Sequence, residues 1–172
     1  MTGRDVVIVP AGAGDLGRVA EIFAHYVTRS VVTFETVPPT VADWQAKLDN
    51  QTALGLPFLV ARAGGEVAGY AYASPWRPKP AYRRTVEDTV YLAPGETGRG
   101  LGRRLLAELL ARAGQAGAHQ MVAVIADAGT DSEASVALHR ALGFAHVGRL
   151  TAVGSKHGRW IDTVLMQRGL TP

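Results

Sequence analysis

Three glycines alternate with other residues just after a predicted strand over residues 85 to 92: Gly98, Gly100 and Gly102. A leucine-rich helix is predicted to begin at about Gly100. Glycines let a backbone approach a ligand closely, and the first amides of a helix point outward at the positive end of its dipole. Three arginines add positive charge at the same place: Arg99, Arg103 and Arg104. The segment therefore predicts an anion site, and its charge favours a ligand that carries phosphates.

The residues around these glycines narrow the class of phosphate ligand. A Walker loop continues with Gly-Lys-Ser/Thr, whereas Gly102 is followed by Arg103 and Arg104. The order Gly98-x-Gly100-x-Gly102 also does not match the Gly-x-Gly-x-x-Gly fingerprint of dinucleotide sites. ATP, GTP and NAD are therefore disfavoured as ligands. A plain tight turn before a helix remains the alternative interpretation of this segment.

The composition limits the classes of protein. A chain of 172 residues with 47% hydrophobic and 19% charged residues is typical of one soluble globular domain, residues 1–172. There is no cysteine, so a disulfide, a thiolate zinc site or an acyl-cysteine intermediate is excluded. The net charge of +3 is modest and the arginines are scattered, which disfavours nucleic acid. No apolar run is long enough to cross a bilayer and no signal sequence is apparent, so we expect a cytoplasmic protein without a membrane partner.

The periodicity of apolar residues predicts an α/β (α+β) fold. Its strands are expected over 6–9, 58–61, 67–73, 85–92, 121–126, 145–154 and 160–168, with Gly64-Gly65 as a hairpin turn. Helices are expected from Asp15 to Tyr26, over 41–51, from about Gly100 to Ala113, and over 132–142, the last opened by a capping box of Thr130 and Glu133. The strand-helix-strand unit from 85 to 126 implies one parallel pair. The result is a mixed sheet with helices on both faces.

The glycine segment, Thr97-Gly98-Arg99-Gly100-Leu101-Gly102, resembles the acyl-CoA signature Gln/Arg-x-x-Gly-x-Gly/Ala of the GNAT superfamily of N-acyltransferases, with Thr97 as a departure. Further motifs resemble the phosphinothricin and methionine sulfoximine N-acetyltransferases of that superfamily. They are Pro75-Trp76-Arg77 with Ala81-Tyr82, Glu87-Asp88-Thr89-Val90-Tyr91, Leu138-His139-Arg140-Ala141-Leu142-Gly143-Phe144, and Lys156-His157-Gly158-Arg159-Trp160. The resemblance spans nearly the whole chain.

The resemblance implies a site for acetyl-CoA. In that family the parallel strands splay apart and hold acyl-CoA between them, which here concerns the strands at 85–92 and 121–126. The backbone at Val90 and Leu92 is then expected to pair with the pantetheine arm, and an N–H near Tyr91 to bind the oxyanion. The pyrophosphate is expected to bind to the loop and the first helical turn: Thr97, Gly98, Arg99, Gly100, Leu101, Gly102, Arg103 and Arg104. No His side chains have the spacing of metal ligands, so no metal is expected.

Two side chains are candidates for moving protons. A strand alternates its side chains, so Glu87 points to one face and Asp88 to the other. Glu87 matches the family's proposed base for the amine. The alternatives are that Glu87 only bonds an arginine and that Asp88 is the base or a buried structural partner. His139 stands where this branch of the family has the acid that protonates the departing thiolate, although a second base or a structural histidine beside Ser135 stays open.

Substrate recognition is predicted from chemistry rather than from spacing. Acceptors of this branch carry a carboxylate and a second polar oxo group, which suit arginine and lysine. The cationic candidates are Arg77, Arg83, Lys156 and Arg159, and the aromatic candidates are Phe34, Trp76 and Tyr82, with Trp160 as a further wall. These aromatic residues could equally belong to the core.

The resemblance therefore implies an acetyl-CoA-dependent N-acetyltransferase. The expected acceptor is a small amino acid-like amine such as phosphinothricin or methionine sulfoximine or sulfone, and a homodimer is implied because related enzymes are often dimers. Two alternatives stay open. The acceptor could be another amine, a protein N-terminus or a polyamine, or the chain could be a module that binds CoA without turnover.

Overall fold

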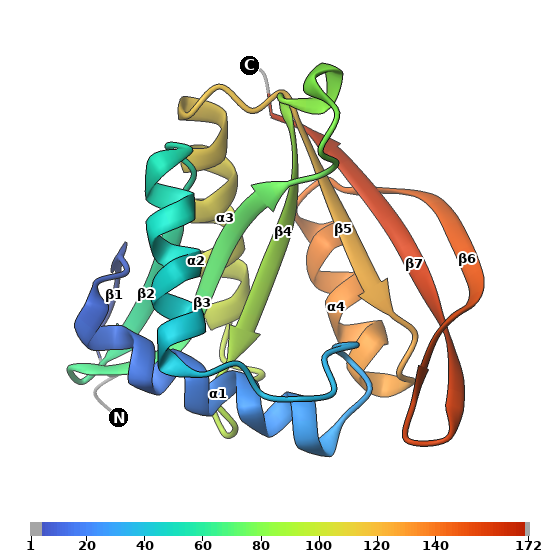
Figure 1. Ribbon diagram of the computed structural model, residues 1–172, viewed down its shortest axis with the longest axis horizontal. Helices are drawn as coiled ribbons and strands as arrows, with labels where there is room; N and C mark the ends of the chain where they lie inside the picture. Colours follow the sequence, from blue (N-terminus) through green and yellow to red (C-terminus); the bar gives the residue numbers. More distant parts are fainter. Residues whose placement is uncertain (1–4, 171–172) are drawn as a thin grey trace.

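A computed structural model describes residues 5–170. The elements follow the order β1 (Val6–Pro10), α1 (Leu16–Arg29), α2 (Val41–Ala53), β2 (Phe58–Ala63), β3 (Glu66–Pro75), β4 (Thr85–Leu92), α3 (Leu101–Gln115), β5 (Gln120–Ala126), α4 (Thr130–Ala141), β6 (Ala145–Lys156) and β7 (Arg159–Gly169) (Figure 1). Two short 3-10 turns, Ala13–Asp15 and Pro80–Tyr82, precede α1 and β4. The predicted order of strands and helices is confirmed. Among residues 5–170, none of the helices has the length and apolar content that crossing a membrane requires.

One sheet of seven strands, in the order β1-β2-β3-β4-β5-β7-β6, forms the centre of the molecule. All neighbours in it are antiparallel except β4 and β5, which are parallel. The predicted hairpin at Gly64-Gly65 joins β2 to β3, and both glycines have the positive φ that this tight turn requires. The fold class predicted from the sequence is therefore confirmed.

Two hydrophobic cores lie on opposite faces of the sheet. On one face α1 and α2 cover β2 and β3 with an aromatic cluster: Phe23, Trp44, Phe58, Tyr70 and Tyr72. On the other face α3 covers β3 and β4 with buried leucines: Leu101, Leu105, Leu106, Leu109 and Leu110. Amphipathic helices can bury their apolar stripe only against such a surface, and this is why the pattern of spacing predicted them.

One local prediction about a helix start is wrong. Thr130 and Glu133 do not form a capping box, because α4 begins at Thr130 itself, after Gly129, whose φ is 74°. Asp15 is the N-cap residue of α1, as the predicted start of that helix indicated, but its side chain makes no capping bond to the helix. Its carboxylate accepts the Gly12 amide at 2.9 Å and the Arg62 guanidinium at 2.9 Å, so it ties the start of α1 to β2 instead.

Gly69 allows β3, β4 and α3 to pack closely. A Cβ at this position would lie 2.6 Å from Leu92 Cδ2, 3.0 Å from the Tyr91 carbonyl oxygen and 3.2 Å from Leu105 Cδ1. Contacts this short require the neighbours to shift, and Leu105 is fully buried. Only glycine therefore fits at this point of the strand that supports β4.

We expect Gly69→Ala to lower the free energy of unfolding by about 1–3 kcal/mol, because overpacking a well-filled core displaces its neighbours. Gly17→Ala in α1 is the matched control, since a Cβ there meets nothing within 4 Å. That control should leave stability unchanged or raise it by up to about 1 kcal/mol through helix propensity. Urea unfolding of both variants measures the difference, and equal stability of Gly69→Ala and the parent chain would contradict the packing argument.

Candidate active site

The two parallel strands, β4 and β5, separate in the middle of the sheet. Pairing between β4 and β5 covers only Thr85 to Glu87 against Gln120 to Val122. Beyond Glu87 the two strands diverge, and α4 lies behind the gap (Figure 1). The splayed parallel pair that the family resemblance implied is therefore present in this chain.

The hydrogen-bond pattern determines which backbone groups of β4 face the gap. Ala93 donates to the Ala68 carbonyl at 2.8 Å, so the odd-numbered residues of β4 bond to β3. Bonding alternates along an antiparallel pair, which turns the backbone of Asp88, Val90 and Leu92 towards the gap. Val90 and Leu92 are the two residues predicted to pair with the pantetheine arm.

Two of the predicted gap residues already have protein partners. The Leu92 carbonyl accepts the Tyr26 hydroxyl from α1 at 2.7 Å, although a carbonyl oxygen has a second lone pair to offer. Tyr91 pairs with Tyr70 of β3, which directs its own amide away from the gap. Its ring packs against Phe23, at 5.1 Å between centroids, and so belongs to the aromatic core.

The glycine segment opens α3 without a side-chain cap. Gly98 and Gly100 have φ angles of 74° and 77°, a left-handed conformation that other residues adopt only with strain. Gly100 is the N-cap residue and contributes no cap of its own. The start of α3 has no side-chain cap at Gly100 among residues 5–170, which is compatible with the predicted anion site.

Some side chains of the glycine-rich segment form bonds within the protein, and others lie exposed at the surface. Arg104 donates to the Val6 carbonyl at 2.8 Å and thus holds β1, while Arg99 lies 3.4 Å from the Glu96 carboxylate. Gly102 is buried, with Leu138 of α4 at 3.5 Å from where its Cβ would be. Thr97, Gly98, Arg99, Gly100 and Arg103 are exposed and Leu101 is buried. The amides and Arg103 are the groups best placed to meet an anion.

Glu87 and Asp88 lie on opposite faces of β4, as the period of a strand predicted. Glu87 is half-buried on the α1 and α2 face, and Asp88 is buried on the face of α3 and α4. Burial raises the pKa of Glu87 above its ordinary value and the charge of Asp88 raises it further, while the positive charges of Arg77 and Lys47 oppose the rise. A carboxylate of raised pKa beside a gap in the sheet is suited to accept a proton from an amine.

His139, predicted as the acid, lies on the other face and is buried. Its Nε2 is 2.9 Å from Asp88 Oδ2 and its Nδ1 is 2.7 Å from the Ser135 carbonyl oxygen. Burial by itself lowers the pKa of His139, but the hydrogen bond and the charge of Asp88, together with the Ser135 carbonyl, outweigh it and raise the pKa above the ordinary value. The sequence had left Asp88 open as a base or a structural partner, and the structure shows it paired with His139.

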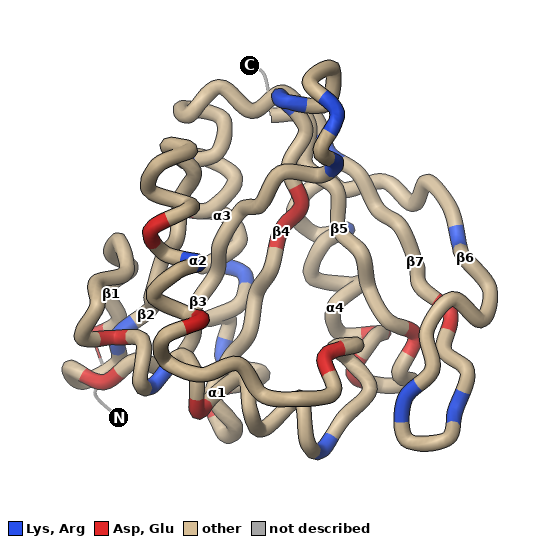
Figure 2. The backbone as a smooth tube through the Cα atoms, in the orientation of Figure 1, with Lys and Arg blue, Asp and Glu red and all other residues tan. Residues whose placement is uncertain are grey.

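The predicted substrate residues gather in two groups. The first group lies in the connection from β3 to β4, which carries Trp76, Arg77, Tyr82 and Arg83. Arg77 Cζ lies 4.7 Å from the centre of the Trp76 ring. Figure 2 shows that this connection is rich in basic residues and adjoins the acidic pair of β4. Lys156 is buried and donates to the Thr33 carbonyl at 2.8 Å, which ties β6 to the loop that carries Phe34. The Phe34 ring rests on Gly154, where a Cβ would lie only 2.4 Å away.

The remaining two candidates lie outside these groups, and like Phe34, Arg77, Tyr82 and Arg83 they are exposed. Arg159 is exposed, and Trp160 is 73% exposed on the β6–β7 hairpin. Trp160 therefore forms no wall of a buried pocket within this chain.

Lys47 is a residue that sequence reasoning missed. Its ammonium lies 4.9 Å from the centre of the Tyr72 ring, and its charge acts on Glu87. One helical turn later, Gln51 donates to Ser74, the residue that pairs with Glu87 across the sheet. Only the packing of α2 across β3 brings Lys47 here, and no local spacing in the sequence signals it.

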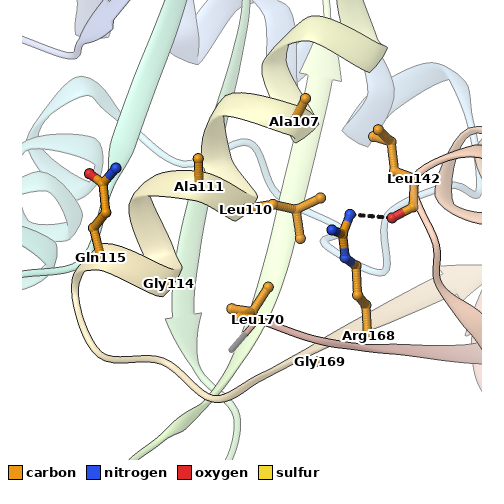
Figure 3. A pocket seen from close by; sticks show the side chains of 9 residues that line it. All are labelled: Ala107, Leu110, Ala111, Gly114, Gln115, Leu142, Arg168, Gly169 and Leu170. Atoms are coloured by element: carbon orange, nitrogen blue, oxygen red, sulfur yellow. Dashed lines mark hydrogen bonds between the residues drawn. The ribbon is translucent and has the colours of Figure 1, made fainter. Parts of the chain in front are cut away.

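One hollow on the surface is not part of this arrangement. It has a volume of about 620 Å³ between α3 and the end of β7, and its lining is mostly apolar (Figure 3). Its one charged side chain, Arg168, donates to the Leu142 carbonyl. Within residues 5–170 there is also no cluster of three or more His, Asp or Glu side chains that could hold a metal ion.

Comparison with known proteins gives one consistent result. Residues 19–144 match the model of the acetyltransferase (GNAT) family. The chain is 47% identical to a phosphinothricin N-acetyltransferase of Alcaligenes faecalis over 156 residues, which cover 91% of this chain and 78% of that protein. It is 41% identical to an L-methionine sulfoximine/L-methionine sulfone acetyltransferase of Pseudomonas aeruginosa, over 94% of this chain and 93% of the relative.

A solved structure shows the same fold with a ligand. It is a GNAT superfamily phosphinothricin acetyltransferase of Sinorhizobium meliloti in complex with acetyl-CoA, 44% identical to this chain. The two superpose with a TM-score of 0.91, over 96% of this chain and 89% of the other.

We expect Arg77→Met to raise the pKa of Glu87 further, because it removes a positive charge that favours the carboxylate. Lys47→Met should act in the same direction. The titration of the Glu87 carboxyl carbon, followed by NMR, measures both. Arg83→Met, which removes an exposed charge from the same connection, is the control and should leave the curve in place; a curve unchanged in all three variants would contradict the assigned electrostatics.

Proposed function

We propose that this chain, which belongs to the acetyltransferase (GNAT) family, transfers the acetyl group of acetyl-CoA directly to the amine of a small amino acid-like acceptor. Phosphinothricin, methionine sulfoximine and methionine sulfone are the favoured acceptors. One observation carries the proposal. The parallel strands β4 and β5 separate immediately after Glu87, beside an uncapped glycine-rich start of α3.

Acetyl-CoA lies in the gap from the side of α3. The pyrophosphate meets the amides between Gly98 and Arg103, where the helix dipole and Arg103 favour its negative charge. The backbone of Val90 and Leu92 is directed at the pantetheine arm, which adds to β4 like a short strand. This placement leaves the thioester at the parting of the two strands.

The acceptor approaches from the face of α1 and α2. Glu87 takes a proton from its ammonium group, and the neutral nitrogen attacks the thioester carbonyl. The C–N bond forms and the C–S bond breaks, while the nitrogen releases its second proton to water and the departing thiolate takes a proton from His139. The chain has no cysteine, which excludes an acyl-cysteine intermediate, and direct attack by the amine is the simplest remaining route.

The charges around Glu87 support an amino acid as the acceptor. An α-carboxylate lies only two bonds from the α-nitrogen, so a substrate whose amine meets Glu87 brings its carboxylate close to Arg77 and Lys47. Neither cation has an ion-pair partner in the described part of the chain. Phe34, held in place by Gly154 and by the tie from Lys156 to Thr33, borders the same face.

The acceptor class is tested with purified protein, acetyl-CoA and a thiol reagent that detects free CoA. We expect phosphinothricin and the two methionine derivatives to be acetylated with kcat/KM at least about tenfold above that of spermidine or of a peptide with a free N-terminal alanine, since one unmet charge contact is worth about 1.5–3 kcal/mol. A preference for the polyamine or the peptide would replace the proposed acceptor. Binding of CoA without any turnover would leave only a CoA-binding module.

Glu87→Gln belongs to the same experiment. Loss of a general base should lower kcat about 10²–10⁴-fold while binding of CoA, followed by calorimetry, stays unchanged. The control is Glu66→Gln, an exposed glutamate at the start of β3 that should have no effect.

The proposal includes a homodimer in the cytoplasm, with small molecules rather than nucleic acid or membranes as partners. β6 is an edge of the sheet, and its hairpin with β7 exposes four large apolar side chains: Val147, Leu150, Val153 and Trp160. Exposed apolar side chains gathered on an edge hairpin favour burial against a second copy.

Sedimentation velocity tests the oligomer. The chain of 18.2 kDa should sediment as a species of twice that mass, and Leu150→Glu with Trp160→Glu should convert it to a monomer. Val37→Glu, at an equally exposed valine in the loop after α1, should not. A parent chain that is monomeric at tens of micromolar would refute this part of the proposal.

A further inference from the structure

Asp88 and His139 form a buried pair on the face of the sheet opposite Glu87. The two side chains are 5% and 6% exposed, and Nε2 lies 2.9 Å from Oδ2. Their residues are 51 positions apart, one on β4 and the other on α4. Two ionisable groups are rarely buried together unless each compensates the charge of the other.

The pair stands at the parting of the parallel strands. Glu87 is the last residue of β4 that pairs with β5, so Asp88 is the first residue past the split, and its backbone faces the gap. α4 packs against β5, so the contact from Asp88 to His139 joins the two diverging halves of the sheet. The pair therefore borders the same gap as Glu87, from the other side.

The contacts of the imidazole ring determine where its protons are. Nδ1 faces the Ser135 carbonyl, which can only accept, so Nδ1 carries a hydrogen. Nε2 faces the Asp88 carboxylate, and it carries a hydrogen as long as Asp88 is ionised. When both nitrogens donate, the ring is an imidazolium ion, which has no lone pair left with which to act as a base.

No other titratable group contacts this ring in the part of the chain that the structure describes. From α4 it meets the Ser135 carbonyl and hydroxyl, and from the start of β6 the edge of the Phe144 ring at 4.9 Å. Asp88 is the contribution of β4, and Glu87 next to it points to the opposite face. The charge of His139 therefore depends on Asp88.

We propose that Asp88 is a positioning residue, which holds His139 as the charged acid that protonates the departing CoA thiolate. This inference rests on the proposed acetyl transfer. The Nε2 hydrogen, which Asp88 accepts before the reaction, passes to the sulfur as the thiolate departs. The Nε2–H bond breaks and an S–H bond forms, which leaves a neutral imidazole whose Nδ1–H still bonds the Ser135 carbonyl. Solvent restores the proton at Nε2 after CoA leaves.

The two faces of the sheet then have separate roles in the reaction. Glu87 removes a proton from the amine on one face, and the pair of Asp88 and His139 returns a proton to sulfur on the other. The negative charge of Asp88 raises the pKa of both Glu87 and His139. It therefore favours the protonated His139 with which the reaction starts and the protonated Glu87 with which it ends.

The first test needs no variant. The ¹⁵N shifts of His139 in the parent chain, recorded across pH, should show an imidazolium that persists above the reference pKa of histidine, about 6.5. A neutral His139 at pH 6, with an unprotonated Nε2, would overturn the inference even if the enzyme is fully active.

Asp88→Asn provides the second test, since the amide can still accept the Nε2 hydrogen but cannot balance a charge. Activity that needs a protonated His139 falls as pH rises through its pKa, so the descending limb of the kcat profile should move to lower pH. The ascending limb, which reports the deprotonation of Glu87, should also move to lower pH, because removing the negative charge of Asp88 lowers the pKa of Glu87. We expect kcat at pH 8 to fall at least about tenfold, within the range of acid catalysis, with KM for acetyl-CoA little changed.

Asp15→Asn is the matched control. It removes a carboxylate of similar burial that is also 2.9 Å from a cation, Arg62, but lies at the start of α1. It should leave the pH profile in place. An Asp88→Asn profile that matches the parent profile, or a shift of equal size in Asp15→Asn, would reduce Asp88 to a structural role. A parent chain that acetylates none of the acceptors would instead refute the proposed function, whatever the spectra of His139 show.

Discussion

Hydrogen bonding between β4 and β5 stops after three residues on each strand, and the site depends on that interruption. A sheet that continued here would satisfy its own backbone groups and leave no room for a ligand. Because it does not, the backbone groups of Val90 and Leu92, which are directed away from β3, find no neighbouring strand on the side of β5. A backbone group without a partner needs one from solvent or from a ligand, so the parting itself predisposes the chain to bind an extended molecule.

The parting would not persist without packing on both sides. The two cores, aromatic under α1 and α2 and leucine-rich under α3, hold β3 and β4 as one unit, while α4 accompanies β5 and β7. The leucine-rich core also contains residues of β5 and β7, such as Ile125 and Val164, so it spans both sides of the split. The bond from Asp88 to His139 on α4 is a further contact between the two sides. On the side of β3 and β4, Tyr26 ties the Leu92 carbonyl to α1.

Two neighbouring carboxylates with different chemical roles, Glu87 and Asp88, lie on opposite faces of one strand. Adjacent residues on β4 point to opposite faces, so two neighbouring carboxylates have different surroundings. Glu87 has cations nearby and partial access to solvent, whereas Asp88 has a buried imidazole. Such a difference in environment is what distinguishes the roles of two chemically similar groups in many active sites.

The amino-acid sequence by itself determined the order of strands and helices, the glycine-rich start of α3, and the faces of Glu87 and Asp88, because these follow from local periodicity and from the conformational freedom of glycine. The wrong capping box at Thr130 was a failure of the same local reasoning, because α4 begins earlier than the spacing indicated, directly after Gly129. Only the tertiary structure decided that Asp88 meets His139 across 51 residues, that the charge of Lys47 acts on Glu87, and that Lys156 is buried against Thr33. These contacts depend on how helices are laid across the sheet, and no local spacing encodes the distance between residues so far apart in the chain.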